Sequence, residues 1–226
     1  RHGVIVTNTP NTNHIAVAEL AVGLMFALAR GIPCMAAQAR AGTWARTTGW
    51  ELTGKTLGVV GYGAIGREVA RRGLGLGMRV LAYDPIFSGD WAGATPVDLP
   101  GLLREARIVS LHCPLTPETA NLINAERIAL LPDGAIVINT ARGGLVDEAA
   151  LYTALTSGKL GGAALDVFIH EPPDSSPLLA LDSFIATPHA GAATAESVDR
   201  AGMLAARNCL AVLRGDPCDF IVPVKG

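Results

Sequence analysis

The chain has 226 residues, of which 50% are hydrophobic and 17% charged, and its formal net charge is -2. This composition is typical of a compact α/β core rather than of a disordered or fibrous chain. The sequence offers no basic stripe for nucleic acid and no polybasic run for a membrane surface, so neither is an expected partner. Four cysteines without CxxC spacing predict reduced thiols in a cytoplasmic protein and no metal site.

The first predicted elements are a short strand at 4–7 and a long helix at 13–30. Polar residues ahead of the apolar run can cap the start of this helix. The run itself, 15–29, is too short to span a bilayer comfortably and contains Glu19, so we interpret it as a buried helix. Gly31 and the proline two residues later end the helix, and a second, shorter helix follows.

From Lys55 onward, strand-like apolar runs alternate with helical patterns. The predicted strands are 57–60, 80–83, 108–112, 135–138, 163–165 and 184–186. The predicted helices are 65–73, 99–106, 125–130, 148–156 and 195–213. Near-continuous apolar strands separated by helices indicate a parallel sheet that is covered on both faces. The expected fold class is therefore α/β, a doubly wound parallel sheet.

A glycine-rich segment, Gly61-Tyr62-Gly63-Ala64-Ile65-Gly66, follows the strand at 57–60 directly and opens the next helix. In this context the first glycine permits a tight turn, the second lets the backbone approach a pyrophosphate, and the third allows close packing of helix and strand. The following strand ends in Asp84, where a carboxylate would bind an adenosine ribose and repel the extra phosphate of NADP. Because strand, loop, helix and acid agree, we interpret the segment as a dinucleotide site that prefers NAD, not as a turn without a ligand.

Three further polar segments follow predicted strands, at the edge where open α/β sheets bind ligands. They carry Arg142, Glu171 and His189. A guanidinium can bind a carboxylate through two parallel hydrogen bonds, and an imidazolium can donate a proton to a carbonyl oxygen as a hydride arrives. A neighbouring carboxylate would favour the charged imidazolium. Each residue taken alone could be an ordinary loop residue, but together they predict reduction of a 2-oxo acid.

The sequence resembles the D-isomer-specific 2-hydroxyacid dehydrogenases, and within them the phosphoglycerate dehydrogenase and hydroxypyruvate/glyoxylate reductase branches. The resemblance runs almost from end to end. Its matching stretches are VTNTPNTNHIAVAEL (6–20), LTGKTLGVVGYGAIGREVA (52–70), YDP (83–85), LHCPLTPETANLI (111–123), INTARGGLVDEAAL (138–151), GGAALDVFIHEPP (161–173) and TPHAGAAT (187–194).

The resemblance implies a role for each residue of the polar segments. It implies that Arg142 binds the substrate, that His189 is the acid/base and that Glu171 is its carboxylate partner. Together with the glycine segment, it gives a predicted set of cofactor-binding residues. These are Gly61, Gly63, Ala64, Ile65, Gly66, Arg67, Asp84, Pro114, Thr140, Ala141, Arg142, Asp166 and His189. Asp166 is expected near the nicotinamide end, and we interpret His112 as a packed or cofactor-side residue.

The resemblance also implies a domain organisation. Family members carry most of a flavodoxin-like substrate domain ahead of the point that corresponds to Arg1. Residues 1–12 would then be a remnant of that domain, and 13–193 would be the dinucleotide-binding domain with an interdomain helix at 13–30. Residues 194–226 would form a C-terminal helix that returns to the substrate domain. The crossing around Trp44 resembles the family's dimer contact, which predicts a homodimer.

The expected function is hydride transfer between NAD(H) and a small D-2-hydroxy or 2-oxo acid. Two alternatives remain open at this point. The same fold and the same arginine, glutamate and histidine occur in NAD(H)-sensing transcriptional corepressors, since a fold alone does not set function. Formate oxidation is a weaker alternative, because the segments specific to it are not evident. The groups that would select one particular acid lie largely in the family's N-terminal region.

Overall fold

The seven strands of the computed structural model, which describes residues 4–223, form one sheet in the order β3-β2-β1-β4-β5-β6-β7. All of its strand pairs are parallel. The strands are β1 (Thr56–Val60), β2 (Arg79–Tyr83), β3 (Thr95–Pro96), β4 (Ile108–Leu111), β5 (Ala135–Asn139), β6 (Leu160–Leu165) and β7 (Phe184–Ala186). The predicted doubly wound parallel sheet is confirmed. Only the two-residue edge strand β3 was not predicted, because two residues give no periodic pattern.

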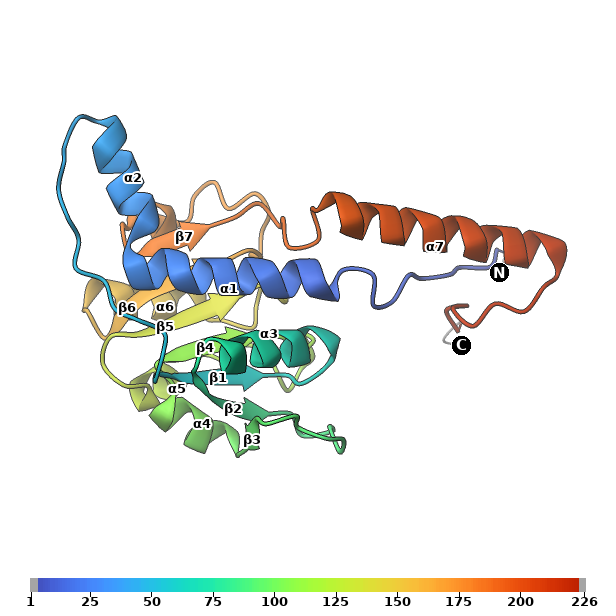
Figure 1. Ribbon diagram of the computed structural model, residues 1–226, viewed down its shortest axis with the longest axis horizontal. Coiled ribbons are helices and arrows are strands. Elements are labelled where there is room, and N and C mark those ends of the chain that lie inside the picture. The colour runs from blue at the N-terminus through green and yellow to red at the C-terminus, as the bar shows by residue number, and fades with distance from the viewer. Residues whose placement is uncertain (1–3, 224–226) are drawn as a thin grey trace.

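Helices cover both faces of the sheet (Figure 1). Helices α1 (His14–Arg30) and α3 (Ala64–Gly75) lie on one face, and their apolar side chains share a core with alternate strand residues such as Val59. On the other face, strand neighbours such as Val60 share a second core with three helices. These are α4 (Leu99–Glu105), α5 (Ala125–Leu130) and α6 (Glu148–Thr156). Burial on both faces explains why the strands read as near-continuous apolar runs.

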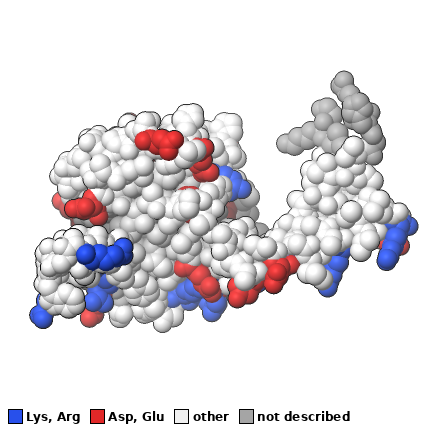
Figure 2. Space-filling model, turned by 90° about the horizontal axis from the view of Figure 1, so that it is seen from above, with Lys and Arg blue, Asp and Glu red and all other residues white. Residues whose placement is uncertain are grey.

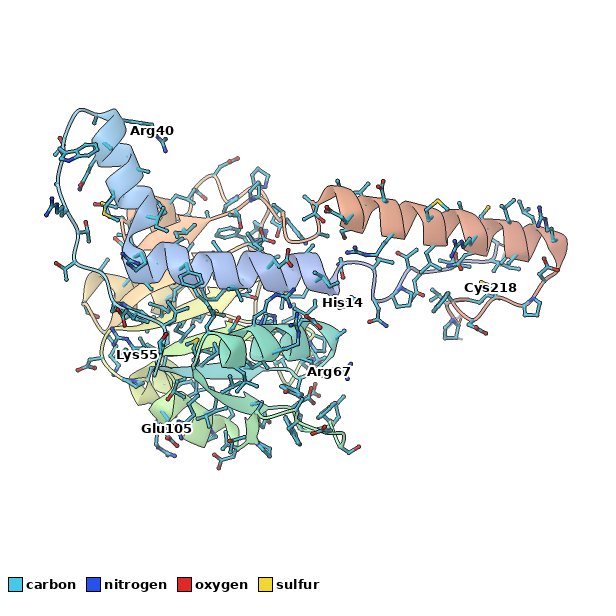
Figure 3. All side chains as sticks on the ribbon, viewed as in Figure 1. His14, Arg40, Lys55, Arg67, Glu105 and Cys218 are labelled. Atoms are coloured by element: carbon cyan, nitrogen blue, oxygen red, sulfur yellow. The ribbon has the colours of Figure 1, made fainter. Side chains whose placement is uncertain are left out.

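Helix α1 is a core helix for most of its length, with Ala18, Ala21 and Met25 fully buried. It ends at Gly31, as predicted, and this glycine has a φ of 60° in the left-handed region. Helix α2 (Ile32–Arg40) then turns away from the sheet and carries Arg40 at its far end (Figure 3). Within residues 4–223 no single helix is long and apolar enough to span a membrane, and α1 and α2 meet the criteria only as a pair bent by 65°.

The C-terminal helix α7 (Ala195–Arg214) projects from the sheet, and the N-terminal segment runs beside it (Figure 1). Polar side chains of α7 hold this segment by its carbonyl groups. Asn208 Nδ2 donates to Asn8 O and Arg200 Nε to Thr12 O, both at 2.9 Å. The predicted remnants of the substrate domain at the two chain ends are therefore side by side, apart from 1–3 and 224–226, which lie outside the described residues.

The prediction of a strand at 4–7 is wrong for its first three residues. Only Thr7 forms a β-bridge, and its partner is Ile221 in an antiparallel pairing. Val4 is 73% exposed. A β-branched run has the propensity for a strand, but a strand forms only where a neighbouring backbone segment supplies a continuous ladder of hydrogen bonds.

Charged side chains are spread over the surface. On the face drawn in Figure 2, acidic and basic residues are interspersed. This distribution agrees with the near-zero net charge of the sequence.

Candidate active site

The candidate site lies at the carboxyl ends of the parallel strands. The chain moves outward from β1 to β2 and β3, then returns to place β4 on the other side of β1. Adjacent crossovers therefore leave in opposite directions between β1 and β4, which opens a crevice there. The glycine segment follows β1, and the polar segments that the sequence singles out follow β5, β6 and β7. The topology thus brings all four segments to one edge.

The three glycines of the loop after β1 meet different surroundings. Gly61 has a φ of 90°, and a Cβ on it would lie 2.6 Å from Cys113 N. A Cβ on Gly66 would lie 2.0 Å from Gly61 O, so helix α3 could not pack as closely on β1. Of the described residues, no heavy atom lies within 4 Å of a Cβ built on Gly63. Gly61 and Gly66 are therefore required by the fold, whereas Gly63 borders open space at the start of α3, where a pyrophosphate fits.

Asp84 organises the loop that follows β2. Its Oδ2 accepts a hydrogen bond from Tyr62 N at 2.8 Å, and its Oδ1 accepts bonds from Ile86 N at 3.0 Å and Phe87 N at 3.2 Å. The carboxylate borders a largely apolar cavity of about 400 Å³, which Pro114 also lines. An acid at the edge of an apolar cavity can bind ribose hydroxyl groups while a flat base occupies the cavity.

Arg67 and Ala64 lie on a different side of the glycine loop from Asp84. They line a cavity of about 450 Å³ together with His14 at the start of α1. Figure 3 shows His14 and Arg67 at neighbouring ends of α1 and α3. The Arg67 guanidinium lies 5.9 Å from the centre of the Phe87 ring. The predicted cofactor residues therefore border two cavities at the start of α3, one with Asp84 and one with Arg67.

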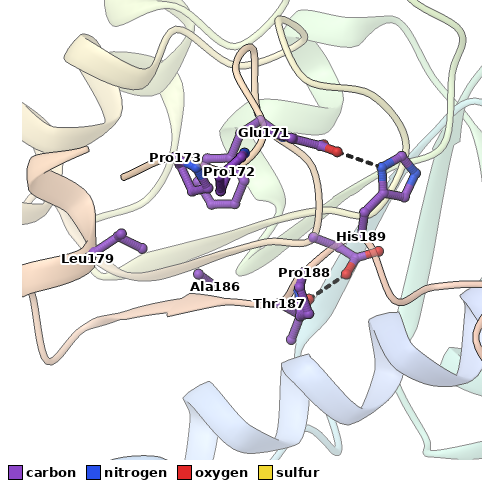
Figure 4. Close-up of a pocket in the computed structure, with 10 residues that line it drawn as sticks. Glu171, Pro172, Pro173, Leu179, Ala186, Thr187, Pro188 and His189 are labelled. Carbon is purple, nitrogen blue, oxygen red and sulfur yellow. Dashed lines mark hydrogen bonds and ion pairs between the residues drawn. The ribbon is translucent and has the colours of Figure 1, made fainter. Parts of the chain in front are cut away.

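His189 and Glu171 form a pair, with His189 Nδ1 at 2.9 Å from Glu171 Oε2 (Figure 4). The other carboxylate oxygen, Oε1, accepts a hydrogen bond from Phe168 N at 3.0 Å. The bonds from His189 and from the Phe168 amide lower the pKa of Glu171 below its ordinary value. Because an ionised carboxylate only accepts hydrogen bonds, Nδ1 of His189 is the donor, and Nε2 is the nitrogen that can act on a ligand.

Asp166, which directly follows β6, holds the loop that carries His189. Its buried carboxylate accepts hydrogen bonds from Thr187 Oγ1 at 2.5 Å and from Ala190 N and Gly191 N at 2.8 Å. His189 itself adopts a left-handed backbone conformation with a φ of 52°. Three bonds to one carboxylate fix the loop in this conformation, which few residues other than glycine adopt.

The main chain of Arg142 is held by the side chain of Asn139, a residue that was not predicted from the sequence. The side chain of Asn139 donates to Arg142 O at 2.8 Å and accepts from Ala141 N at 3.0 Å. Asn139 is 1% exposed and closes strand β5. A polar residue that ends an apolar strand was the available signal, because such a side chain needs hydrogen-bond partners within the fold.

A central cavity of about 380 Å³ connects these groups. Its lining includes Ile65, Pro114, Thr140, Ala141, Arg142, Asp166 and His189. Two buried atoms of residues in its lining, Thr140 Oγ1 and His112 Nδ1, have no hydrogen-bond partner among the described residues. The other ring nitrogen of His112 lies 2.8 Å from Ser110 Oγ. Unpaired buried polar atoms are rare, so the cavity can offer hydrogen bonds to the ribose or carboxamide of a nicotinamide nucleotide.

A second cavity, of about 410 Å³, lies beside the histidine–glutamate pair (Figure 4). Its lining is mostly apolar and includes Phe168, Pro172, Leu179 and Pro188. It shares His189 and Asp166 with the central cavity, so His189 stands between a cavity of mixed lining and an apolar one.

Comparison with known proteins gives a consistent result. Residues 22–191 match the family described as D-isomer specific 2-hydroxyacid dehydrogenase, NAD binding domain. The D-3-phosphoglycerate dehydrogenase of Methanocaldococcus jannaschii is 47% identical over 226 residues, which cover 97% of this chain and 43% of that relative. The hydroxypyruvate reductase of Thermotoga maritima is 48% identical over 206 residues, which cover 89% of this chain and 67% of the relative.

Among solved structures, the D-lactate dehydrogenase from Aquifex aeolicus complexed with NAD and lactic acid has a TM-score of 0.90 and 33% sequence identity. The alignment covers 99% of this chain and 74% of that one. The chain thus spans less than half of the phosphoglycerate dehydrogenase and about three quarters of the lactate dehydrogenase. The chain belongs to the D-isomer-specific 2-hydroxyacid dehydrogenases, and residues 22–191 are the NAD-binding domain of that family.

Proposed function

We propose that the complete protein transfers a hydride between NAD(H) and a small D-2-hydroxy or 2-oxo acid. One observation carries the proposal: His189, which is paired with Glu171, lines the same cavity as Arg142, at the sheet edge that also holds the glycine loop. An acid/base, its orienting carboxylate and an anion-binding group in one crevice are the parts that this reaction needs.

The nucleotide would be held from both sides of the crevice between β1 and β4. The open side of Gly63 and the start of α3 would receive the pyrophosphate, and Asp84 would bind the adenosine ribose. Thr140 Oγ1, buried and without a partner among the described residues, would bind toward the nicotinamide end. When bound, the nicotinamide supplies the carbon that accepts or gives the hydride.

His189 would move the proton. In the oxidation of a hydroxy acid, Nε2 would take the proton from the hydroxyl oxygen while the hydride leaves the carbon that bears this hydroxyl group. In the reduction, Nε2 returns a proton to the carbonyl oxygen. The bond from Nδ1 to Glu171 fixes which ring nitrogen faces the substrate and stabilises the ring when it is charged. Arg142 would bind the substrate carboxylate with its planar fork of donors.

The domain organisation is part of the proposal. The His189 side chain is 55% exposed in this chain, and a general acid works best in a site from which water is excluded. We propose that the rest of a substrate domain covers the cleft and selects the acid. Residues 1–12 and 194–226 would belong to that domain, and 13–193 to the nucleotide domain.

A cytoplasmic homodimer is the proposed form of the protein. The exposure of Trp44, of which 90% is accessible, supports a dimer contact at the crossing between α2 and β1. Sedimentation of the complete protein tests this part of the proposal, and a monomer at micromolar concentration would contradict it.

Replacing His189 tests the proposed reaction. We expect His189→Gln to lower kcat of the complete protein by roughly 10²- to 10⁴-fold, because it removes the general acid. The affinity for NADH should change much less than kcat, since the glycine loop and Asp84 are unchanged. NADH oxidation with glyoxylate, hydroxypyruvate, phosphohydroxypyruvate and pyruvate gives the readout. His170→Gln, which changes an exposed histidine outside the pair, is the matched control.

Two outcomes would contradict the proposal. Wild-type turnover in His189→Gln would remove this residue from the reaction. Absence of turnover with every 2-oxo acid, despite normal NADH binding by the wild-type protein, would favour an NAD(H)-sensing binding protein instead. In that case, capture of a protein partner should depend on NADH.

A further inference from the structure

The segment that carries Glu171 is held by hydrogen bonds from its main-chain amides, not by burial of the side chains that follow Phe168. Phe168 is buried, but the Ile169 side chain is 55% exposed and His170 is also exposed. Two successive amide groups bind carboxylates here: Phe168 N binds Glu171 itself, and Ile169 N donates to Glu148 Oε1 at 3.2 Å. Glu148 therefore ties this segment to a different element of the fold.

The position of Glu148 at the start of α6 leaves its carboxylate available for this contact. Asp147, the residue before the helix, accepts hydrogen bonds from Ala149 N and Ala150 N at 3.0 Å and so satisfies two of the first helix amides. With the helix start capped by its neighbour, the Glu148 side chain can bind the amide of Ile169, 21 residues away in the sequence.

The segment between β5 and α6, which carries Arg142 and Gly143, also touches the Glu171 segment through its backbone. A Cβ on Gly143 would lie 2.0 Å from Phe168 O and 2.7 Å from Ile169 N, so glycine is needed for the approach. Gly143 directly follows Arg142, and α6 begins five residues later. The Arg142 segment and the Glu171 segment are thus joined at two points, one through the Gly143 main chain and one through the Glu148 side chain.

We propose that Glu148 is a positioning residue of the active site, whose hydrogen bond to Ile169 N fixes the Glu171–His189 pair relative to Arg142. This inference rests on the proposed function, because it assigns Glu148 to the geometry of that reaction. Without the carboxylate, the Ile169 amide loses its partner and the Glu171 segment gains freedom. Glu171 then holds His189 Nδ1 in the observed orientation for a smaller fraction of the time.

The expected effect is confined to the chemical step. We expect Glu148→Ala to lower kcat of the complete protein about 10-fold, since small misplacements of catalytic groups have effects of this size or larger. The Kd for NADH should not change, because the glycine loop and Asp84 follow β1 and β2, away from α6. Glu148→Gln keeps an oxygen that can accept from Ile169 N, so it should restore kcat to within about twofold of wild type.

Hydrogen exchange gives a readout that does not depend on turnover. The Ile169 amide should exchange faster in Glu148→Ala than in the wild type and in Glu148→Gln. Glu126→Ala is the matched control, because Glu126 is also an acidic residue in the first turn of a helix, α5. Glu148→Ser provides the same test if Glu148→Ala does not fold.

The outcomes separate this inference from the proposed function. If His189→Gln abolishes turnover but Glu148→Ala keeps the wild-type kcat and Ile169 exchange rate, Glu148 has no positioning role. If Glu148→Gln loses as much activity as Glu148→Ala, the charge rather than the hydrogen bond matters, and the inference is overturned. If His189→Gln itself is fully active, the proposed function fails first.

Discussion

Arg142 is placed by its backbone, and its side chain remains exposed at the cavity. Its Nη1 donates to the carbonyl of Ala141 at 2.6 Å, which leaves the other guanidinium donors for a ligand. A lysine at this position keeps the positive charge but loses the planar fork. The chemistry that distinguishes the two residues is therefore the bidentate recognition of a carboxylate.

We expect Arg142→Lys to lower kcat/KM for the 2-oxo acid by about 10- to 100-fold, the effect of losing one hydrogen bond between charged groups. NADH affinity should change much less than kcat/KM, because the glycine loop and Asp84 are intact. Steady-state kinetics of the complete protein measure this effect, with Arg104→Lys, an exposed change on α4, as the control. An unchanged kcat/KM would show that Arg142 does not hold the substrate.

At the scale of an element, the loop between β1 and α3 contains one glycine that the packing requires and one that only a bound nucleotide explains. Gly66 is needed for helix α3 to pack on the strand, since a Cβ there would lie 2.0 Å from Gly61 O. Gly63 has a φ of -71°, which any residue can adopt, and its surroundings are open. The fold alone does not explain a glycine at 63, but the approach of a pyrophosphate to the backbone does.

These surroundings predict that alanine at one glycine lowers stability and that alanine at the other weakens NADH binding. Gly66→Ala should destabilise the chain by about 1–3 kcal/mol, the range for overpacking, whereas Gly63→Ala should leave the free energy of unfolding nearly unchanged. Gly63→Ala should instead weaken NADH binding at least about 10-fold, or about 1.4 kcal/mol. Denaturant unfolding and NADH titration measure the two effects, and Gly75→Ala, at the other end of α3, is the control. Normal NADH binding by Gly63→Ala would remove this loop from the cofactor site.

The helix and strand patterns could be predicted because each element carries a local signal. The strands are buried on both faces and so form continuous apolar runs, and α1 and α7 both end at glycines in the left-handed conformation. Elements that depend on distant contacts could not be predicted in this way. Segment 4–7 has strand propensity but pairs only at Thr7, and the 3-10 helix η1 (Pro177–Ala180) is too short for a periodic pattern.

The candidate site follows the same division. Residues at strand ends could be selected from the sequence, because parallel strands bring their carboxyl ends to one edge. Two of their supporting groups could not. Thr187 and Glu148 act through hydrogen bonds to residues 21 positions away in the sequence, and only the folded chain brings those donors and acceptors together. Asn139 acts within its own loop, and its place at the end of an apolar strand was a signal that the sequence offered.

At the scale of the whole molecule, one half-buried histidine links the nucleotide cleft to global stability. His112 follows β4, and burial of its ring lowers its pKa from 6.5 to about 3. In the unfolded chain the same ring binds a proton below about pH 6.5. Between pH 3 and 6.5 the unfolded state therefore binds more protons than the folded state, and stability rises with pH in this window. Above pH 6.5 both states are neutral at this site, and the contribution vanishes.

The window between pH 5 and 6.5 isolates this effect, because carboxyl groups such as Glu68 and Glu171 have pKa values below their ordinary value of 4.5 and stay ionised there. We expect His112 to make the free energy of unfolding at pH 5 about 2 kcal/mol lower than at pH 7, from about 1.4 kcal/mol per pH unit. His112→Gln removes the titrating ring and should flatten the dependence by that amount, whereas the exposed control His170→Gln should not. Urea unfolding of each variant at several pH values gives the measurement. An equal slope in His112→Gln and wild type would mean that the ring is protonated in the folded chain, and that water or another group reaches Nδ1 in the cleft.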